Sequence, residues 1–184
     1  MLEFNYDLNY KELDFTDEET RKLYRIGRGE QGVLLVRPYT DDICAHWRFK
    51  TPKIAIESAH TIFDMYLDYL EQQDFIGMDM CRKFLEMGFT RSRRYANHRD
   101  GKKYDKEGNV IPQEKDHATC HFAESATIFK KVRDIVAKSE TYVKMRKHWR
   151  KEVEHSQEAR VNALATASNV KRAQYSNSKV SRTA

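Results

Sequence analysis

The stretch TPKIAIESAHTIFDMYLDYL, residues 51–70, decides the class of fold to which the chain belongs. Threonine followed by proline is a strong helix start, because Thr51 suits the N-cap and Pro52 suits the first helical position. Apolar residues then recur at helical spacing, at Ala55, Ala59, Ile62, Phe63, Tyr66, Leu67 and Leu70. The pattern predicts a helix that runs to about Gln73 and buries one face.

Two further helical segments follow. Asp74 suits the N-cap of a second helix, and Gly88 suits its C-terminal stop. After a loop rich in glycine and lysine, a long helical stretch is expected to begin near Thr119 and to restart at Ser139. The residues expected to face inward are Met78, Cys81, Phe84 and Leu85 in the first segment, and Phe122, Ala126, Phe129, Val132, Ile135, Val136, Tyr142, Met145 and Trp149 in the second.

On the N-terminal side the pattern changes from helical spacing to alternation. An irregular arm, residues 1–24, precedes a short apolar run at residues 33–36. Residues 43–50 then alternate, with Ile43, Ala45, Trp47 and Phe49 on one face and Cys44, His46, Arg48 and Lys50 on the other. Alternation with period two is typical of a strand, and two such runs joined by a turn predict a hairpin. We therefore expect an α+β fold, mainly helical, with a short antiparallel β-hairpin near the N-terminus.

The totals indicate one domain with a tail. The 184 residues suit a single globular domain at residues 1–155, followed by a polar, basic C-terminal tail at residues 156–184. The three cysteines are widely spaced, and the N-terminus lacks the pattern of a signal peptide. No apolar run approaches the roughly 18 residues that a membrane span requires. We expect a cytoplasmic protein that does not enter a membrane.

The positive charge of the chain is concentrated in one segment. Residues 91–106 contain seven arginines and lysines and two aspartates, so the segment carries the same +5 as the whole chain. Arginine offers planar, paired donors that suit phosphate, and tyrosine offers a surface on which bases stack. The alternative is a solvated basic face that pairs with acidic residues elsewhere.

A second cationic feature is the expected strand face. Alternation would place His46, Arg48 and Lys50 in one row, suited to a phosphate backbone. Edge strands also carry such residues only to block aggregation, so that alternative stays open. The candidate anion-binding residues are Arg25, Arg28, His46, Arg48, Lys50, Arg91, Arg93, Arg94, Tyr95, Asn97, His98 and Arg99.

The spacing Gly27-x-Gly29-x-x-Gly32 matches the letters of a nucleotide-binding fingerprint, but its context does not. A dinucleotide motif follows a strand and opens a helix, whereas here an acidic arm precedes and an apolar run follows. A tight glycine turn is the favoured interpretation. Arg25 and Arg28 beside it remain candidates for an anion site, because glycine lets main-chain amides approach a phosphate.

Signals for metal or covalent chemistry are weak. His117 and His121 lie one helical turn apart with Cys120 between them, but zinc requires three or four ligands. We predict neither a metal nor a cofactor. Candidate acid–base residues, if the protein is an enzyme, are His46, His98 and Glu30.

Several motifs together resemble one uncharacterised family. They are RIGRGEQG at residues 25–32, HWRFKT at residues 46–51, GMDMCRKF at residues 77–84 and GFTRSRRYANH at residues 88–98. The family is a domain-of-unknown-function group of bacteria, phages and some fungi, and the likeness covers roughly residues 6–149. The resemblance implies a cytoplasmic protein and carries no activity or functional residues with it.

Three functions follow from these features. The first is a small basic protein that binds nucleic acid or another phosphate-bearing ligand through its arginine- and lysine-rich surface. The second is a small enzyme acting on a phosphorylated or nucleotide substrate, which requires the candidate residues to converge on one cavity. The third is a protein-interaction module built on the C-terminal helix.

Overall fold

The computed structural model describes residues 3–156, and every regular element in that range is a helix. The chain divides into two compact units, Met1–Arg146 and Lys147–Ala184, and the fold described here is that of the first. The tail expected from residue 156 onward lies outside the described residues, apart from Ser156. The helices are α1 Glu18–Arg21, α2 Tyr39–Cys44, α3 Pro52–Glu71, α4 Phe75–Asn97, α5 His121–Lys138, α6 Glu140–Trp149, and the π-helical turn η1 Arg150–Glu154.

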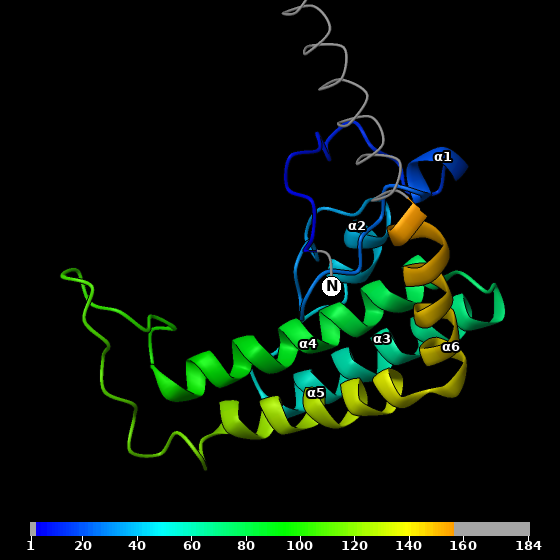
Figure 1. Cartoon of the computed structure of the whole chain (residues 1–184). Helices are drawn as coiled ribbons and strands as arrows, with labels where there is room; N and C mark the ends of the chain where they lie inside the picture. The colour runs from blue at the N-terminus through cyan, green and yellow to red at the C-terminus, as the bar shows by residue number, and fades with distance from the viewer. Residues whose placement is uncertain (1–2, 157–184) are drawn as a thin grey trace, which may run out of the picture. The chain divides into compact units, whose positions relative to one another are not determined.

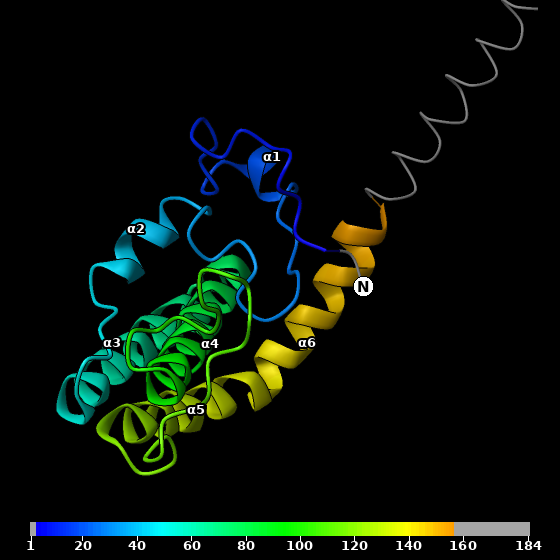
Figure 2. The same cartoon turned by 90° about the vertical axis from the view of Figure 1, so that its left-hand side faces the viewer.

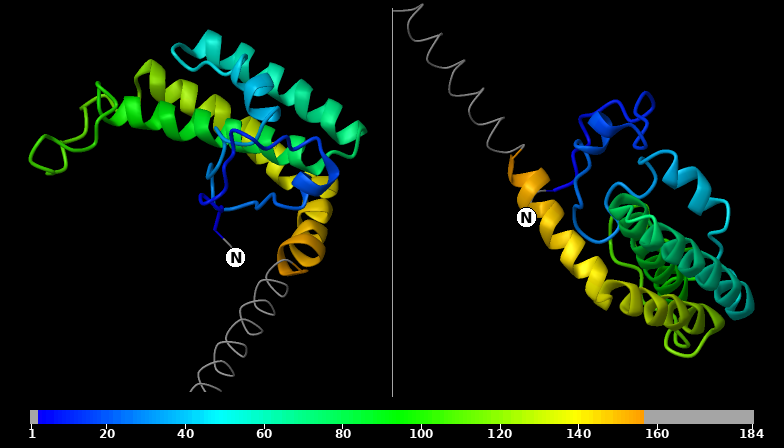
Figure 3. Two further views of the ribbon diagram at one scale, coloured as in Figure 1. Left: turned by 90° about the horizontal axis from the view of Figure 1, so that it is seen from above. Right: turned by 90° about the vertical axis from the view of Figure 1, so that its right-hand side faces the viewer.

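Helices α3, α4 and α5 pack side by side as a bundle, and α2 lies against α4 (Figure 1). The N-terminal arm, which includes α1, covers the bundle on the α4 side (Figure 2) and crosses α4 when seen from above (Figure 3). Within residues 3–156, none of the helices combines the length and the apolar run needed to cross a bilayer.

The start of α3 and the turn from α3 to α4 follow from their capping residues, as the sequence predicts. The Thr51 hydroxyl accepts a hydrogen bond from the main-chain N–H of Ile54, and Pro52 opens α3. Gln73 takes a left-handed conformation (φ 54°) after the end of α3, and Asp74 then caps α4 through the N–H groups of Ile76 and Gly77.

Helix α4 is the centre of the unit. Residues 75–85 are all buried, which means that neighbours surround three consecutive turns on every side. The expected stop at Gly88 is wrong, because α4 continues to Asn97. A Cβ at Gly88 would lie 2.4 Å from the ring of Phe129 on α5, so this glycine allows close helix packing rather than ending the helix.

The expected β-hairpin is also wrong, and so is the α+β fold class. Residues 33–36 form consecutive turns that bury Val33 and Val36 and leave Leu34 exposed. Ile43 lies in α2, Ala45 and His46 form a turn, and residues 47–49 have no regular secondary structure. The one isolated β-bridge in residues 3–156 joins Tyr104 to Val110, in the loop between α4 and α5.

The alternating pattern misleads because it carries no information about which element the segment packs against. Residues 46–50, which we call the 46–50 segment, pack on helices: the Arg48 main-chain N–H donates to Ser58 Oγ at 3.0 Å, and the Ser58 hydroxyl donates to His46 O at 2.9 Å. One serine of α3 therefore satisfies two of the main-chain groups that a second strand would otherwise have paired. Trp47 and Phe49 still face the bundle, while His46, Arg48 and Lys50 are exposed.

The core contains a charged cluster built on Asp79 of α4. Both its carboxylate and Lys83 are fully buried, and Tyr24 and Tyr142 each donate a hydrogen bond to the carboxylate. Arg82 Nε donates to Asp79 Oδ1 at 2.8 Å, and Lys83 Nζ lies 3.8 Å from Oδ2. The cluster joins the N-terminal arm, α4 and α6 around one negative charge.

Electrostatics explains why this carboxylate stays ionised. Burial by itself raises the pKa of Asp79, but Arg82 and Lys83 outweigh burial and hold that pKa well below its usual range. Burial, reinforced by the Asp79 charge, raises the pKa of Tyr24 and of Tyr142, so both remain hydroxyl donors.

Replacing Asp79 with asparagine should destabilise the protein by about 3–5 kcal/mol, because Arg82 and Lys83 would keep buried charges without their counter-ion. Chemical denaturation at neutral pH measures the loss. Asp64→Asn, on the exposed side of α3, is the matched control and should leave the free energy of unfolding unchanged. An equal effect of both substitutions would contradict the role assigned to Asp79.

The stability that Asp79 contributes should depend on pH in a defined way. Since the folded-state pKa of Asp79 is below its unfolded value of about 3.9, its contribution is full above that value and is lost as pH falls through the folded pKa. The difference in unfolding free energy between the native protein and Asp79→Asn should be constant above about pH 5 and shrink below about pH 4. A difference that stays constant at acid pH would refute this assignment.

Candidate functional site

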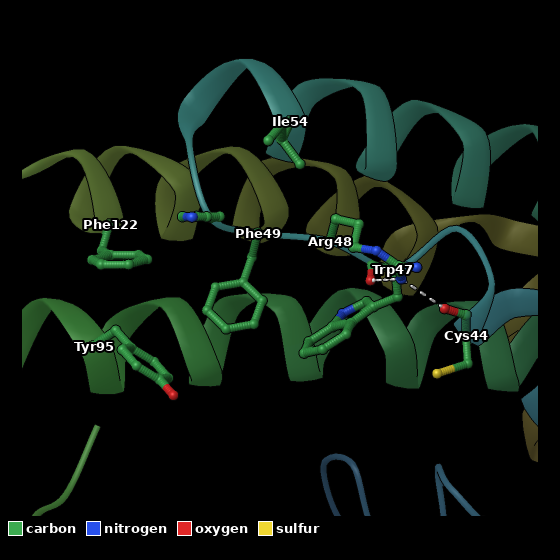
Figure 4. Close-up of a pocket in the computed structure, with 8 residues that line it drawn as sticks. Cys44, Trp47, Arg48, Phe49, Ile54, Tyr95 and Phe122 are labelled. Carbon is green, nitrogen blue, oxygen red and sulfur yellow. Dashed lines mark hydrogen bonds between the residues drawn. The ribbon is translucent and has the colours of Figure 1, made fainter. Parts of the chain in front are cut away.

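A cavity lined by four aromatic side chains opens beside the 46–50 segment. Its volume is about 930 Å³, within the range of small-molecule sites. Figure 4 shows the rings following one another along α4, with Ile54 of α3 and Cys44 of α2 at the edges. We call it the aromatic cavity; the residues that define it are Trp47, Phe49, Tyr95, Phe122, Arg48 and Lys50.

The four rings support one another and stay half-buried. Ring centroids lie 5.1 Å apart for Trp47 and Phe49, 5.6 Å for Phe49 and Tyr95, and 5.4 Å for Tyr95 and Phe122, all in tilted arrangements. The Trp47 indole N–H donates to the main-chain oxygen of Phe84 at 3.1 Å, which anchors the row to α4. The cavity wall is therefore pre-formed, and it keeps aromatic surface accessible to a ligand.

Two cations lie at this cavity. Arg48 Nη1 donates to the main-chain oxygens of Trp47 at 2.7 Å and Cys44 at 3.2 Å, so the guanidinium is held near the end of α2. Lys50 is exposed and lines the same cavity. Aromatic surface beside exposed cations is suited to a flat ligand that carries negative charge.

The continuation of α4 past Gly88 brings one residue of the basic segment to the aromatic cavity, although none of that segment's arginines and lysines lines it. Tyr95 belongs to the basic segment, residues 91–106, and Arg48 and Lys50 belong to the 46–50 segment, yet all three line one cavity. The helix distributes the other basic residues around its axis. Arg94 is exposed, and Arg99 lies beyond the helix end, 76% exposed and 3.5 Å from Glu114.

Arg93 and Asn97 have a structural use. Arg93 donates to the main-chain oxygen of His117 at 3.0 Å and to Asn97 Oδ1 at 2.8 Å, while the main-chain oxygen of Asn97 accepts from Glu114. These contacts fasten the loop between α4 and α5 to the end of α4. Neither residue lines the aromatic cavity.

The three candidate acid–base residues lie apart. His98 is 7% exposed, and its Nδ1 has no hydrogen-bond partner among the described residues. His46 is exposed and does not line the aromatic cavity, whereas Glu30 lines a second cavity. Within residues 3–156, no group of three or more histidine, cysteine or acidic side chains is arranged to hold a metal ion.

The second cavity lies between the glycine turn and α4, with a volume of about 560 Å³. We call it the glycine-turn cavity. Its charged side chains are those of Arg28, Glu30 and Arg91, Tyr6 and Gln31 add neutral polar groups, and its apolar wall includes Leu34, Leu35 and Met87. The structure therefore brings Arg28 to Arg91, as an anion site would require, but places them in a different cavity from Arg48.

The glycine turn is held by the buried charged cluster. Lys83 Nζ donates to the main-chain oxygen of Gln31 at 2.8 Å, and Arg82 Nη2 donates to that of Gly29 at 3.2 Å. The Gln31 side-chain oxygen accepts from the main-chain N–H of Arg28 at 2.8 Å. The expectation of a tight turn without the nucleotide fingerprint's strand and helix agrees with this geometry.

Arg25 lines neither cavity. It faces the N-terminal arm, where burial raises the pKa of Tyr10 to about 12 and the Arg25 charge opposes that rise. The sequence interpretation missed Trp47, Phe49 and Phe122, which it assigned to apolar core faces. The signal that could have found Trp47 and Phe49 is their position beside Arg48 and Lys50, whereas Phe122 of α5 has no such neighbours in the sequence.

Alanine substitutions in the turn should separate backbone strain from steric clash. Gly29 (φ 51°) has open space where an alanine Cβ would lie, so Gly29→Ala should cost about 1–2 kcal/mol. At Gly32 (φ 75°) a Cβ would lie 2.2 Å from the buried Phe4 ring, so Gly32→Ala should cost about 2–5 kcal/mol. Denaturant unfolding measures both, and equal losses would show that the Phe4 contact does not restrain the turn.

Comparison with known proteins identifies a family and nothing closer. No curated protein and no solved structure matches the chain. The model of DUF4385, a domain of unknown function, matches residues 5–152. That range contains every residue of both cavities described above. The resemblance to an uncharacterised family is thus confirmed, and the chain belongs to the DUF4385 family.

Proposed function

We propose that the protein binds single-stranded nucleic acid in the aromatic cavity, with bases on the aromatic rings and phosphates at Arg48 and Lys50. The observation that carries the proposal is the shared lining of this cavity by four aromatic rings and two cations. Stacking on aromatic side chains suits any base, since each has a π-face, and cations beside the rings suit the backbone between bases.

The surrounding charge supports a polymer rather than a single nucleotide. Arg94 and Arg99 are exposed near the end of α4 that carries Tyr95. Exposed cations, here Arg94 on α4 and Arg99 just beyond its end, attract a chain of phosphates and release its counter-ions on binding. A phosphorylated small molecule shares this chemistry, so mononucleotides belong in the test as competitors.

The enzyme hypothesis has less support. It requires the acid–base candidates to converge with the arginines, but His46, His98 and Glu30 lie in three different environments. An interaction module through the C-terminal helix has no observation in its favour within the described residues. A cytoplasmic location is part of our proposal, because three free cysteine thiols suit a reducing compartment.

Fluorescence anisotropy with labelled single-stranded DNA and RNA at two salt concentrations tests the proposal. We expect binding at low salt that weakens as salt rises, with a slope of about −0.7 per phosphate contacted. Duplex DNA and mononucleotides should compete poorly. Absence of binding to any single strand at low salt would refute the proposed function.

Phe49→Leu should weaken binding about tenfold or more, because leucine fills the space but offers no π-face for stacking. Phe63→Leu is the matched control: Phe63 is half-buried on α3 outside the cavity and should not affect affinity. Circular dichroism establishes that both variants fold. Equal affinity of the two variants would argue against base stacking at Phe49.

Lys50→Ala should weaken binding modestly and reduce the salt slope by about 0.7, the contribution of one phosphate contact. Lys11→Ala, which removes an exposed lysine from the N-terminal arm, should leave the slope unchanged.

In parallel, alkylation of the half-buried Cys44 at the cavity edge should slow when oligonucleotide is bound, whereas that of Cys120 should not. An unchanged salt slope together with unprotected Cys44 would place binding elsewhere.

A further inference from the structure

The two cavities lie along the same face of α4. Met87 and Arg91 line the glycine-turn cavity, and Tyr95 lines the aromatic cavity. These three residues are spaced at i, i+4 and i+8, so each is separated from the next by about one helical turn, roughly 6 Å along the axis. A strand with a base in the aromatic cavity can therefore place a neighbouring nucleotide in the glycine-turn cavity.

The glycine-turn cavity differs in chemistry from a simple phosphate site. It presents the guanidinium groups of Arg28 and Arg91 together with the carboxylate of Glu30. Arg28 is also 3.2 Å from Glu3, so its charge is partly neutralised. A phosphate alone would be repelled by the carboxylate, and the ligand must therefore offer hydrogen-bond donors as well as acceptors.

Glu30 is positioned to receive such donors. The Thr90 hydroxyl of α4 donates to Glu30 Oε2 at 2.7 Å, which fixes the carboxylate against the helix. An ionised carboxylate has about four acceptor positions on its two oxygens, so this one contact leaves both oxygens able to accept from a ligand.

Only guanine offers two adjacent donors, one for each oxygen of a carboxylate. Guanine has two adjacent donors, N1–H and the 2-amino group, and carries the acceptors O6 and N7 that arginine binds. Adenine and cytosine have an acceptor nitrogen next to their amino group, and in thymine and uracil two carbonyl oxygens flank N3–H. The volume of about 560 Å³ is ample for a purine.

We infer that the glycine-turn cavity selects guanine, with Glu30 accepting from N1–H and the 2-amino group and Arg91 donating to O6 or N7. This inference rests on the proposed single-strand binding and adds base specificity to it. Arg28, at the exposed rim, contacts the adjoining phosphate.

The test compares single-stranded oligonucleotides in which thymine alternates with guanine, with inosine or with adenine. Inosine differs from guanosine only in lacking the 2-amino group, so the ratio of the two affinities isolates that hydrogen bond. The guanine strand should bind about tenfold or more tighter than the inosine strand, as expected for a bond to a charged acceptor. The adenine strand should bind no tighter than the inosine strand.

Glu30→Gln should abolish this preference, because the carboxamide turns a donor toward the guanine donors but can still accept from Thr90. The variant should still bind oligo-thymidine, and circular dichroism should show a native fold, which together show that the aromatic cavity is intact. Glu3→Gln is the matched control, since Glu3 also faces Arg28 but does not line the cavity, and it should retain the preference.

The outcomes separate the two ideas. Tighter binding of the guanine strand that disappears in Glu30→Gln supports the inference. Equal binding of the guanine and inosine strands, or a preference that survives Glu30→Gln, overturns the inference while single-strand binding stands. Failure of every strand, oligo-thymidine included, overturns both the inference and the proposed function.

Discussion

The rest of the structure depends on one constraint, the buried ion pair between Asp79 and Arg82. Both residues belong to α4, and Lys83 lies beside them. A charge removed from water must be compensated by partners in the protein. Here those partners come from the N-terminal arm and α6 as well as from α4, through the hydroxyls of Tyr24 and Tyr142. Parts of the chain more than 50 residues apart are thereby held in fixed positions relative to α4.

The same buried charges also fix the position of the glycine turn at the surface. Arg82 and Lys83 also donate to main-chain oxygens of the glycine turn, and the Lys83 ammonium lies 5.1 Å from the centroid of the Phe4 ring. The turn is thus fixed from beneath by the core charges and from above by the arm. A cavity between this turn and α4 can keep its shape without a sheet to support it, which gives the fold a rigid wall for recognition.

Particular residues show where sequence reasoning succeeds and where it fails. Thr51 and Asp74 act as the caps that their types predict, because capping depends only on the next few main-chain groups. Gly88 is not the helix end that it resembles, since a glycine at a close contact and a glycine at a C-cap look alike in sequence. The alternation of residues 43–50 predicts a strand that does not form, and the main chain of Arg48 hydrogen-bonds to Ser58 of a helix rather than to a strand.

The sequence by itself determined α3, α5 and α6, the caps at Thr51 and Asp74, the tight glycine turn and the concentration of positive charge in residues 91–106, because each depends on neighbours within a few positions. Only the tertiary structure decided which cations share a cavity. It joined Tyr95 to Arg48 and Arg91 to Glu30, and it diverted Arg93 to fasten a loop. Such partnerships depend on how helices pack, and helix packing is set by contacts between residues far apart in the chain.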